Sequence, residues 1–250
     1  MSIFSFFRNL LKKKKSYYFI ADEESLEFLD NELSQSRIFA IDTEFDWRTT
    51  YFPKLSIIQI STINCLFLID CLELNPAFIL KKYLEDDRYL KIFHSVRSDA
   101  TVLSKCIYCK TKNVFDIQVA EKILRDGLIQ AYGKIVKNYF SIELSKGETN
   151  SNWLKRPLTE NQIRYALEDV DYLIEIYNLQ RKRLKKKGQL KHVFDLSKIE
   201  LDLGNESLKD LRRKKIYKKY SGRNIEIYMW REEIAESQNI PPNFIFKDKY

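Results

Sequence analysis

Hydrophobic residues follow two different spacings along this chain, and each spacing predicts a type of secondary structure. Short apolar runs rich in Ile, Phe and Tyr are typical of buried strands. Such runs occur at residues 17–20, 37–41, 55–60, 66–70, 89–93 and 113–116. Helical spacing predicts helices up to residue 33, near 76–84 and 97–105, and from 117 onward. The three strands between 37 and 70 favour an antiparallel meander. A mixed α/β sheet covered by helices is therefore the simplest architecture.

Two acidic residues stand one residue apart at the end of the second predicted strand, in Ile41-Asp42-Thr43-Glu44-Phe45. Because side chains alternate along a strand, Asp42 and Glu44 point to the same face. Two neighbouring carboxylates repel each other and are costly to bury unless a cation compensates them. Hard divalent cations with oxygen ligands suit such a pair. The alternative, a strand end with two solvated acids, remains open from this segment alone.

A helix is predicted after Pro157, with Thr159 as its N-cap and Gln162 in a weak capping box. Its apolar stripe is formed by Ile163, Leu167, Val170, Ile174 and Tyr177. Tyr165 and Asp169 are four residues apart and lie one above the other on the flank of this stripe. They could line a cleft, but spacing alone favours a surface tyrosine beside a solvated aspartate.

The composition points to an anionic partner. The net charge is +8 and the isoelectric point is about 9.1, which fits nucleic acid or a membrane surface. Residues 205–223 carry eight Lys or Arg against two acids, as a basic linker or a basic helix face. The N-terminal apolar stretch is too short to span a bilayer, and either a short amphipathic helix or a frayed terminus fits it. Four cysteines without a secretion signal suggest a reducing, cytoplasmic setting.

Four segments together resemble ribonuclease D, of the DEDDy subgroup of the DEDD 3′–5′ exonuclease superfamily. The first is Asp42-Thr43-Glu44-Phe45 with its continuation at residues 51–60, and the second is His94 through Asp99. The third is Val114-Phe115-Asp116, and the fourth joins Trp153-Leu154-Lys155-Arg156-Pro157-Leu158 to Tyr165-Ala166-Leu167-Glu168-Asp169-Val170. The tail from Met229 to Asn243 is similar to the opening of an HRDC domain, a small helical nucleic-acid-binding module.

This resemblance implies a ribonuclease H-like mixed sheet with a partial helical C-terminal extension. It identifies Asp42, Glu44, Asp99 and Asp169 as ligands of two divalent ions, Mg²⁺ or Mn²⁺, with Asp42 bridging them. Tyr165 would orient the attacking water or act as its general base. Thr43, Phe45, Gln59 and His94 are candidate substrate-binding residues, and Trp47 and Tyr51 are further aromatics that could stack on bases. A core role suits His94 better, and a packing role suits each aromatic equally well.

The implied reaction is 3′–5′ hydrolysis of RNA that releases nucleoside 5′-monophosphates, with tRNA precursors carrying 3′ extensions as the expected substrate. The expected organisation is a basic extension at 1–16, the exonuclease domain at 17–195, a basic linker at 196–223 and a partial HRDC-like segment at 224–250. Two alternatives remain. A DNA 3′–5′ exonuclease of the same superfamily would share the acids and the tyrosine. A non-catalytic RNA-binding module would have no chemical need for them.

Overall fold

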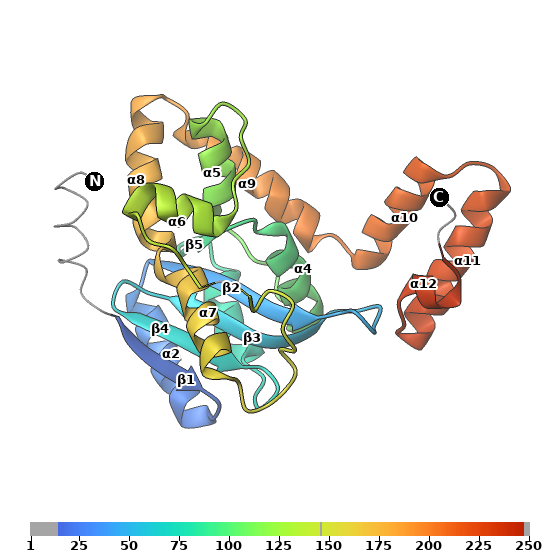
Figure 1. Cartoon of the computed structure of the whole chain (residues 1–250), viewed down its shortest axis with the longest axis horizontal. Coiled ribbons are helices and arrows are strands. Elements are labelled where there is room, and N and C mark those ends of the chain that lie inside the picture. Colours follow the sequence, from blue (N-terminus) through green and yellow to red (C-terminus); the bar gives the residue numbers. More distant parts are fainter. Residues whose placement is uncertain (1–14, 146, 248–250) are drawn as a thin grey trace.

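The computed structural model describes residues 15–145 and 147–247, and its centre is a six-stranded mixed sheet (Figure 1). The strand order is β1-β4-β3-β2-β5-β6. Strands β2, β3 and β4 form the predicted antiparallel meander, while β1, β5 and β6 add in parallel. The bounds are β1 Ser16–Ile20, β2 Ile38–Asp46, β3 Lys54–Ser61, β4 Cys65–Asp70, β5 Leu90–Phe93 and β6 Val114–Asp116. The predicted fold class is confirmed.

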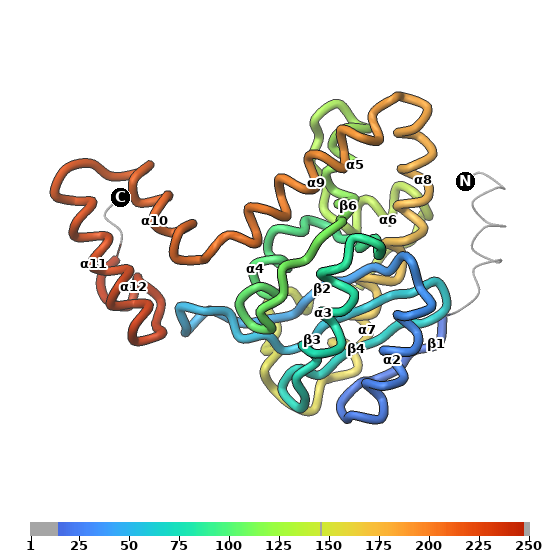
Figure 2. The backbone as a smooth tube through the Cα atoms, turned by 180° about the vertical axis from the view of Figure 1, so that it is seen from behind, coloured from blue at the N-terminus to red at the C-terminus, as the bar shows by residue number. Residues whose placement is uncertain are grey.

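Helices cover both faces of this sheet, with α7 and α8 on one face and α2, α3 and α4 on the other (Figures 1 and 2). One face packs Ile58 and Ile60 of β3 against apolar residues of α2 to α4, and the other packs Ala40 and Ile92 against α5, α6 and α8. The bounds are α2 Glu23–Gln35, α3 Ala77–Leu84, α4 Arg97–Cys106, α5 Ile117–Leu124, α6 Tyr132–Phe140, α7 Glu160–Asp171 and α8 Leu173–Lys186.

The helix after Pro157 begins as predicted. Thr159 accepts from the Gln162 backbone at 3.2 Å, and the Gln162 side chain accepts from the Thr159 backbone at 3.0 Å, so the capping box is complete. The continuous stripe predicted from Ile163 to Tyr177 is divided at Tyr172, where α7 ends and α8 begins. This break leaves α7 as a separate helix lying across the sheet beside β3 and β4.

The boundary expected between residues 195 and 196 falls inside a helix, α9 (Leu190–Asn205). The C-terminal end of α9 lies directly on α4. A Cβ added at Gly204 would stand 2.5 Å from the Arg97 carbonyl oxygen, and Thr101 donates to the Gly204 carbonyl at 3.1 Å. This close approach requires glycine. The first part of the expected linker, residues 196–205, is therefore packed on the main domain. Charge along the chain does not indicate which residues pack against it.

Three further helices form a C-terminal extension: α10 Leu208–Lys219, α11 Arg223–Gln238 and α12 Pro242–Ile245. The hairpin of β2 and β3 reaches toward this extension (Figure 1). Asn239 accepts from the Phe52 backbone at 3.1 Å, and the Arg212 guanidinium lies 4.3 Å from the Tyr51 ring centre. Tyr51 has no exposed surface, so it is a packing residue at this contact.

The expectations for the N-terminal stretch concern residues 1–14, which lie outside the described part. The described part begins at Lys15, whose ammonium donates to Ser61 at 2.7 Å and to the Asp171 carbonyl at 2.9 Å. Across residues 15–145 and 147–247, no helix combines the length and the apolar character needed to cross a membrane. All four cysteines are free thiols.

Candidate metal centre

Three carboxylates from two elements meet at one place on the sheet. Asp42 and Glu44 lie on the same face of β2, and Asp169 comes from α7, which packs over that face. One carboxylate oxygen from each residue lies within 4.8 Å of the other two. The structure therefore brings together the strand pair and the helix aspartate, which are separated by more than a hundred residues in the sequence.

Asp99 reaches the site from another direction, out of the first turn of α4. Its Oδ1 accepts a 2.6 Å hydrogen bond from the Thr43 hydroxyl, and both side chains are buried. Thr43 stands between Asp42 and Glu44 in the sequence, so it faces the opposite side of β2. Thr43, expected as a substrate-binding residue, instead holds Asp99 in place. Asp99 does not belong to the compact group of three oxygens.

The four acids lie in a setting that penalises their negative charge. Burial raises the pKa of Asp42 and of Asp99 well above the ordinary range; the charge of Asp169 adds to this at Asp42, and the charge of Asp42 adds to it at Asp99. Burial and the neighbouring aspartates raise the pKa of Glu44 to about 10. Burial raises the pKa of Asp169 to about 7, although a hydrogen bond with Tyr165 opposes the shift.

These four carboxylates fit a divalent-cation site. Within the described residues, none of them forms an ion pair with a lysine, arginine or histidine. Clustered acids without protein cations remain stable at neutral pH when they bind protons or metal ions. Carboxylate oxygens are the ligands that Mg²⁺ and Mn²⁺ prefer.

The same pKa shifts predict how pH affects stability when chelator removes divalent cations. Because the folded-state pKa values are raised, the folded protein binds more protons than the unfolded chain, whose acids titrate near pH 4. The stability that this extra proton binding gives the folded protein is fully present below about pH 4. It is lost as the pH rises through the folded-state pKa of each acid, which is about 7 for Asp169 and about 10 for Glu44. In EDTA, the free energy of unfolding in urea should fall between pH 5 and 9.

Mg²⁺ should reduce this loss, because the cation stabilises the ionised acids. The Asp169→Asn variant should lose less stability than the parent protein between pH 5 and 8, since it lacks one titrating group. A free energy of unfolding that stays level or rises with pH in EDTA would contradict the raised pKa values of the four acids.

Tyr165 lies one helical turn before Asp169 on α7. Its hydroxyl stands 3.2 Å from the Thr149 hydroxyl, and its ring centre is 6.0 Å from that of Trp153. Burial and the charge of Asp169 raise the pKa of the Tyr165 phenol above its ordinary value. The phenol is therefore protonated at neutral pH, which suits a hydrogen-bond donor or orienting group better than a base.

Two supporting residues around Tyr165 were missed by sequence reasoning. Thr149 contacts the tyrosine hydroxyl, and Glu168 accepts from the backbone amide of Ser145 at 2.8 Å and from its hydroxyl. Glu168 thus ties the segment before Thr149 to α7. The only sequence signal was proximity to motif residues, because such contacts depend on how the intervening segment folds.

The Trp-x-x-Arg-Pro motif has a structural role beside the site. Arg156 forms a two-pronged ion pair with the buried Asp70 at the end of β4, at 2.5 and 2.6 Å. Trp153 is buried against Ile57, Leu68 and Ala166. These contacts fix the segment that leads into α7, and α7 carries Tyr165 and Asp169.

The remaining candidate substrate-binding residues lie in different surroundings. Phe45 is partly buried, packs on the core and meets the Trp47 ring edge-on at 5.6 Å. His94 is partly buried, its Nε2 lies 3.2 Å from the Gln130 carbonyl oxygen, and burial lowers its pKa. Gln59 has no exposed surface. The burial of Gln59 follows from the place of β3 as a central strand covered on both faces, and a direct contact with substrate stays an expectation.

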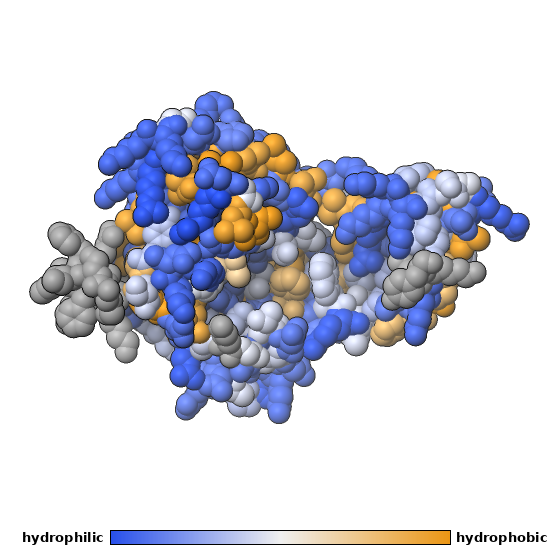
Figure 3. Space-filling model, turned by 45° about the horizontal axis from the view of Figure 1, so that its top comes forward, coloured by the Kyte–Doolittle hydropathy of each residue, from blue (hydrophilic) through white to orange (hydrophobic). Residues whose placement is uncertain are grey.

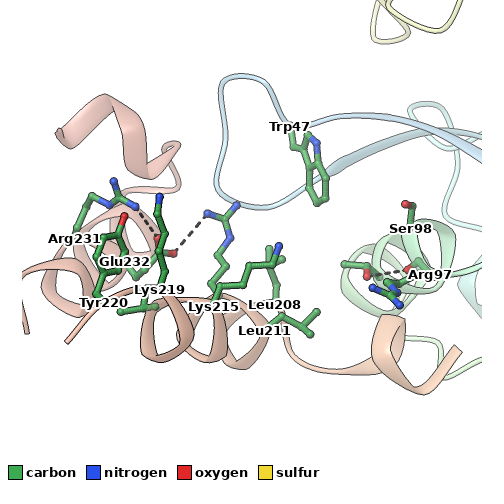
Figure 4. A pocket seen from close by; sticks show the side chains of 13 residues that line it. Trp47, Arg97, Ser98, Leu208, Leu211, Lys215, Lys219, Tyr220, Arg231 and Glu232 are labelled. Atoms are coloured by element: carbon green, nitrogen blue, oxygen red, sulfur yellow. Dashed lines mark hydrogen bonds and ion pairs between the residues drawn. The ribbon is translucent and has the colours of Figure 1, made fainter. Parts of the chain in front are cut away.

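A cavity of about 670 Å³ lies between the main domain and the C-terminal extension, and none of the four acids lines it (Figure 4). On one side it is lined by Trp47 from the β2–β3 hairpin and by Arg97 and Ser98, which precede Asp99 in α4. On the other side it is lined by α10, including Lys215 and Lys219. Trp47 is 40% exposed. Hydrophilic residues dominate the visible surface of the extension (Figure 3).

Comparisons with known proteins agree with this arrangement. The family model described as 3′–5′ exonuclease matches residues 17–185. Ribonuclease D of Pseudomonas paraeruginosa is 30% identical over 236 residues, covering 92% of this chain and 63% of that protein. The crystal structure of Escherichia coli RNase D, an exoribonuclease involved in structured RNA processing, superimposes with a TM-score of 0.83 at 26% identity, covering 93% of this chain and 64% of that one.

The catalytic core of RRP6 from Trypanosoma brucei shares the fold, with a TM-score of 0.75 at 23% identity over 96% of this chain and 72% of that one. The expected ribonuclease H-like sheet is thus the fold of solved exonucleases. The chain spans 63% and 64% of the lengths of the two ribonuclease D proteins described above.

Proposed function

This chain belongs to the 3′–5′ exonuclease family, and from that membership we propose that it is a metal-dependent 3′–5′ exoribonuclease. It removes nucleotides from the 3′ end of RNA as nucleoside 5′-monophosphates. The observation that carries the proposal is the meeting of Asp42, Glu44 and Asp169 within 4.8 Å, with Asp99 and Tyr165 beside them. A single strand or helix could not assemble this group, so the fold itself supports a shared role.

The side chains have distinct tasks in this proposal. Asp42, Glu44, Asp99 and Asp169 hold two divalent cations, Mg²⁺ or Mn²⁺. When bound, such ions promote attack by water and neutralise charge that develops on the leaving oxygen. Asp42 is central among the acids, since the pKa of Glu44 and that of Asp99 both respond to its charge. Thr43 keeps Asp99 in position through its 2.6 Å hydrogen bond.

Tyr165 orients the attacking water in this scheme. Its protonated hydroxyl is held beside Thr149 and near Asp169, on the edge of the acidic group. A phenol with a raised pKa stays protonated and can donate a hydrogen bond that orients the water.

RNA is the proposed substrate, and the cavity beside α10 supports it. Trp47 offers a ring on which a base can stack, and Lys215 offers a positive charge for the backbone. Within the described residues Lys215 forms no ion pair, so its charge is available. Arg97, Ser98 and Thr101 of α4, the helix that carries Asp99, line this cavity, and we propose that the strand continues there from the acids. We propose tRNA precursors with 3′ extensions as natural substrates and the cytoplasm as the setting.

Replacing Trp47 should weaken RNA binding more than it slows cleavage. Loss of one stacked base costs about 1–3 kcal/mol, so Trp47→Ala should raise the Kd for single-stranded RNA by about 5- to 150-fold and leave kcat at saturating RNA nearly unchanged. Trp230→Ala is the matched control, because Trp230 is 53% exposed on α11 and does not line the cavity. Fluorescence anisotropy in EDTA measures the Kd of both variants. Equal Kd values for the two variants would exclude Trp47 from the RNA path.

A timed digest tests the activity itself. A 3′-extended tRNA and a DNA strand of matched sequence are incubated with the full chain in Mg²⁺, Mn²⁺ or EDTA. We expect stepwise shortening of the RNA from its 3′ end with release of 5′-monophosphates, and none in EDTA. Faster digestion of the DNA would favour the DNA exonuclease. RNA binding without shortening in either metal would favour the non-catalytic module.

A further inference from the structure

One fully buried side chain lacks the polar contacts that burial demands. Gln59, in the middle of β3, has no exposed surface. Neither its Nε2 nor its Oε1 has a hydrogen-bond partner among residues 15–145 and 147–247. Buried amides are hydrogen-bonded in most proteins because leaving them unpaired destabilises the fold. An unpaired amide in a central strand therefore indicates a role other than stability.

The strand register places this amide next to the acidic group. Gln59 is the direct cross-strand partner of Asp42 in the antiparallel pair of β2 and β3. Directly opposed residues point to the same face of a sheet, with their Cβ atoms about 5 Å apart. A glutamine side chain at that spacing can reach the carboxylate of its partner. The same register pairs Glu44 with Ile57, which has no polar group to offer.

The cross-strand neighbour of Gln59 on β4 is apolar, and the hydroxyl of Ser61, two residues along β3, already accepts from Lys15 and donates to the Thr62 carbonyl. The β4 neighbour is Leu68. Leu68 is buried with Ile57, Trp153 and Ala166 in a cluster beneath α7. The carboxylate of Asp42 is therefore the acceptor that the sheet offers to the Gln59 amide. A carboxylate that must keep a fixed orientation toward a cation is the kind of group that such an amide supports.

We infer that Gln59 is a positioning residue of the metal centre: when cations are bound and Asp42 is ionised, the amide that is unpaired in this structure would donate to the Asp42 carboxylate and fix the direction of its remaining oxygen lone pairs. The inference rests on the proposed function, since it needs cations at the acids. It replaces the expectation that Gln59 contacts substrate. Gln59 acts through Asp42, so it is required for tight cation binding and is unfavourable for the stability of the protein without cations.

A second buried glutamine provides the matched control. Gln180 in α8 also has no exposed surface, but its Nε2 donates to the Ile117 carbonyl and to Glu121, both at 3.0 Å. Its hydrogen bonds join α8 to α5, and none of its partners belongs to the acidic group. Gln180 therefore has the structural role that Gln59 lacks. Methionine matches the length and shape of glutamine without the amide, so Gln59→Met and Gln180→Met remove one amide each.

The experiment measures cation affinity and stability on the full chain after EDTA treatment and dialysis. Isothermal titration with MnCl₂ gives the Kd, and thermal unfolding in EDTA gives the Tm. For Gln59→Met we expect a Kd for Mn²⁺ about tenfold higher than in the parent protein, with a Tm that is unchanged or higher. For Gln180→Met we expect the parent Kd and a lower Tm. Gln59→Met thus weakens Mn²⁺ binding without lowering the Tm, whereas Gln180→Met lowers the Tm without weakening Mn²⁺ binding.

The outcomes separate this inference from the proposed function. If the parent protein binds no Mn²⁺, the metal centre itself is wrong. If the parent binds Mn²⁺ and Gln59→Met binds it equally well with a lower Tm, Gln59 is structural and only this inference is overturned. Gln59→Leu serves as a second variant, and it should show the same weakened Mn²⁺ binding if Gln59→Met does not fold.

Discussion

The Asp42→Asn variant should lose RNA cleavage completely, even in excess Mn²⁺. Asp42 lies within 4.8 Å of Glu44 and Asp169, and its charge acts on both Glu44 and Asp99. Asparagine keeps the size of the side chain but removes the charge and one anionic oxygen. In the proposed arrangement Asp42 would be shared by two cations, and a shared ligand would tolerate this change least. A gel assay on 5′-labelled RNA over hours should detect no shortening.

Asp46→Asn is the matched control for this experiment. Asp46 lies on the same strand, but it accepts hydrogen bonds from the backbone and side chain of Arg48 and does not belong to the group of three carboxylates. It should cleave RNA at nearly the parent rate. Asp42→Asn should also keep its fold and gain stability at neutral pH in EDTA, because folding would no longer require this buried carboxyl to take up a proton. Substantial cleavage by Asp42→Asn in Mn²⁺ would remove Asp42 from the bridging position.

The Tyr165→Phe variant should keep its affinity for Mn²⁺ and RNA and lose most of its turnover. The ring still packs beside Trp153, while the hydroxyl next to Thr149 and Asp169 is removed. Misplacement of a reacting group by about 1 Å costs on the order of 100-fold in rate, so we expect kcat to fall by about that factor. Single-turnover cleavage and Mn²⁺ titration together measure the two properties.

Tyr177→Phe controls for the loss of a phenol in general. Tyr177 is buried against Phe115 in α8 and lies outside the acidic group, so its loss should leave kcat unchanged. An equal fall in kcat for both variants would mean that Tyr165 acts through stability alone. Turnover by Tyr165→Phe at the parent rate would remove the hydroxyl from the reaction.

Several parts of this centre were predictable because they depend on local periodicity. Strand geometry places Asp42 and Glu44 on one face whatever the rest of the chain does. Helix geometry places Tyr165 one turn before Asp169 in the same way. The meander and the order of elements also followed from short-range patterns. The motif resemblance joined these separate pieces into one candidate site before their distances were known.

Other features depend on contacts between residues far apart in the sequence. The burial of Gln59 results from the central place of β3 between β2 and β4, with helices on both faces. The continuation of the main domain through α9 depends on the fit of Gly204 against Arg97. The cavity beside Trp47 exists only because residues of α10 lie across from α4 and the hairpin. Charge and hydropathy along the chain contain no signal for any of these.

The sequence by itself determined which side chains carry the chemistry and which face of each element bears them, because those properties repeat every two or 3.6 residues. Tertiary structure alone decided that Asp169 crosses to Asp42 and Glu44, that Thr43 holds Asp99, and that Gln59 stands unpaired beside them. The reason is physical: the packing of α7 and α4 on the sheet is set by many weak contacts between distant residues, and these contacts fix the distances at which the acids act on one another.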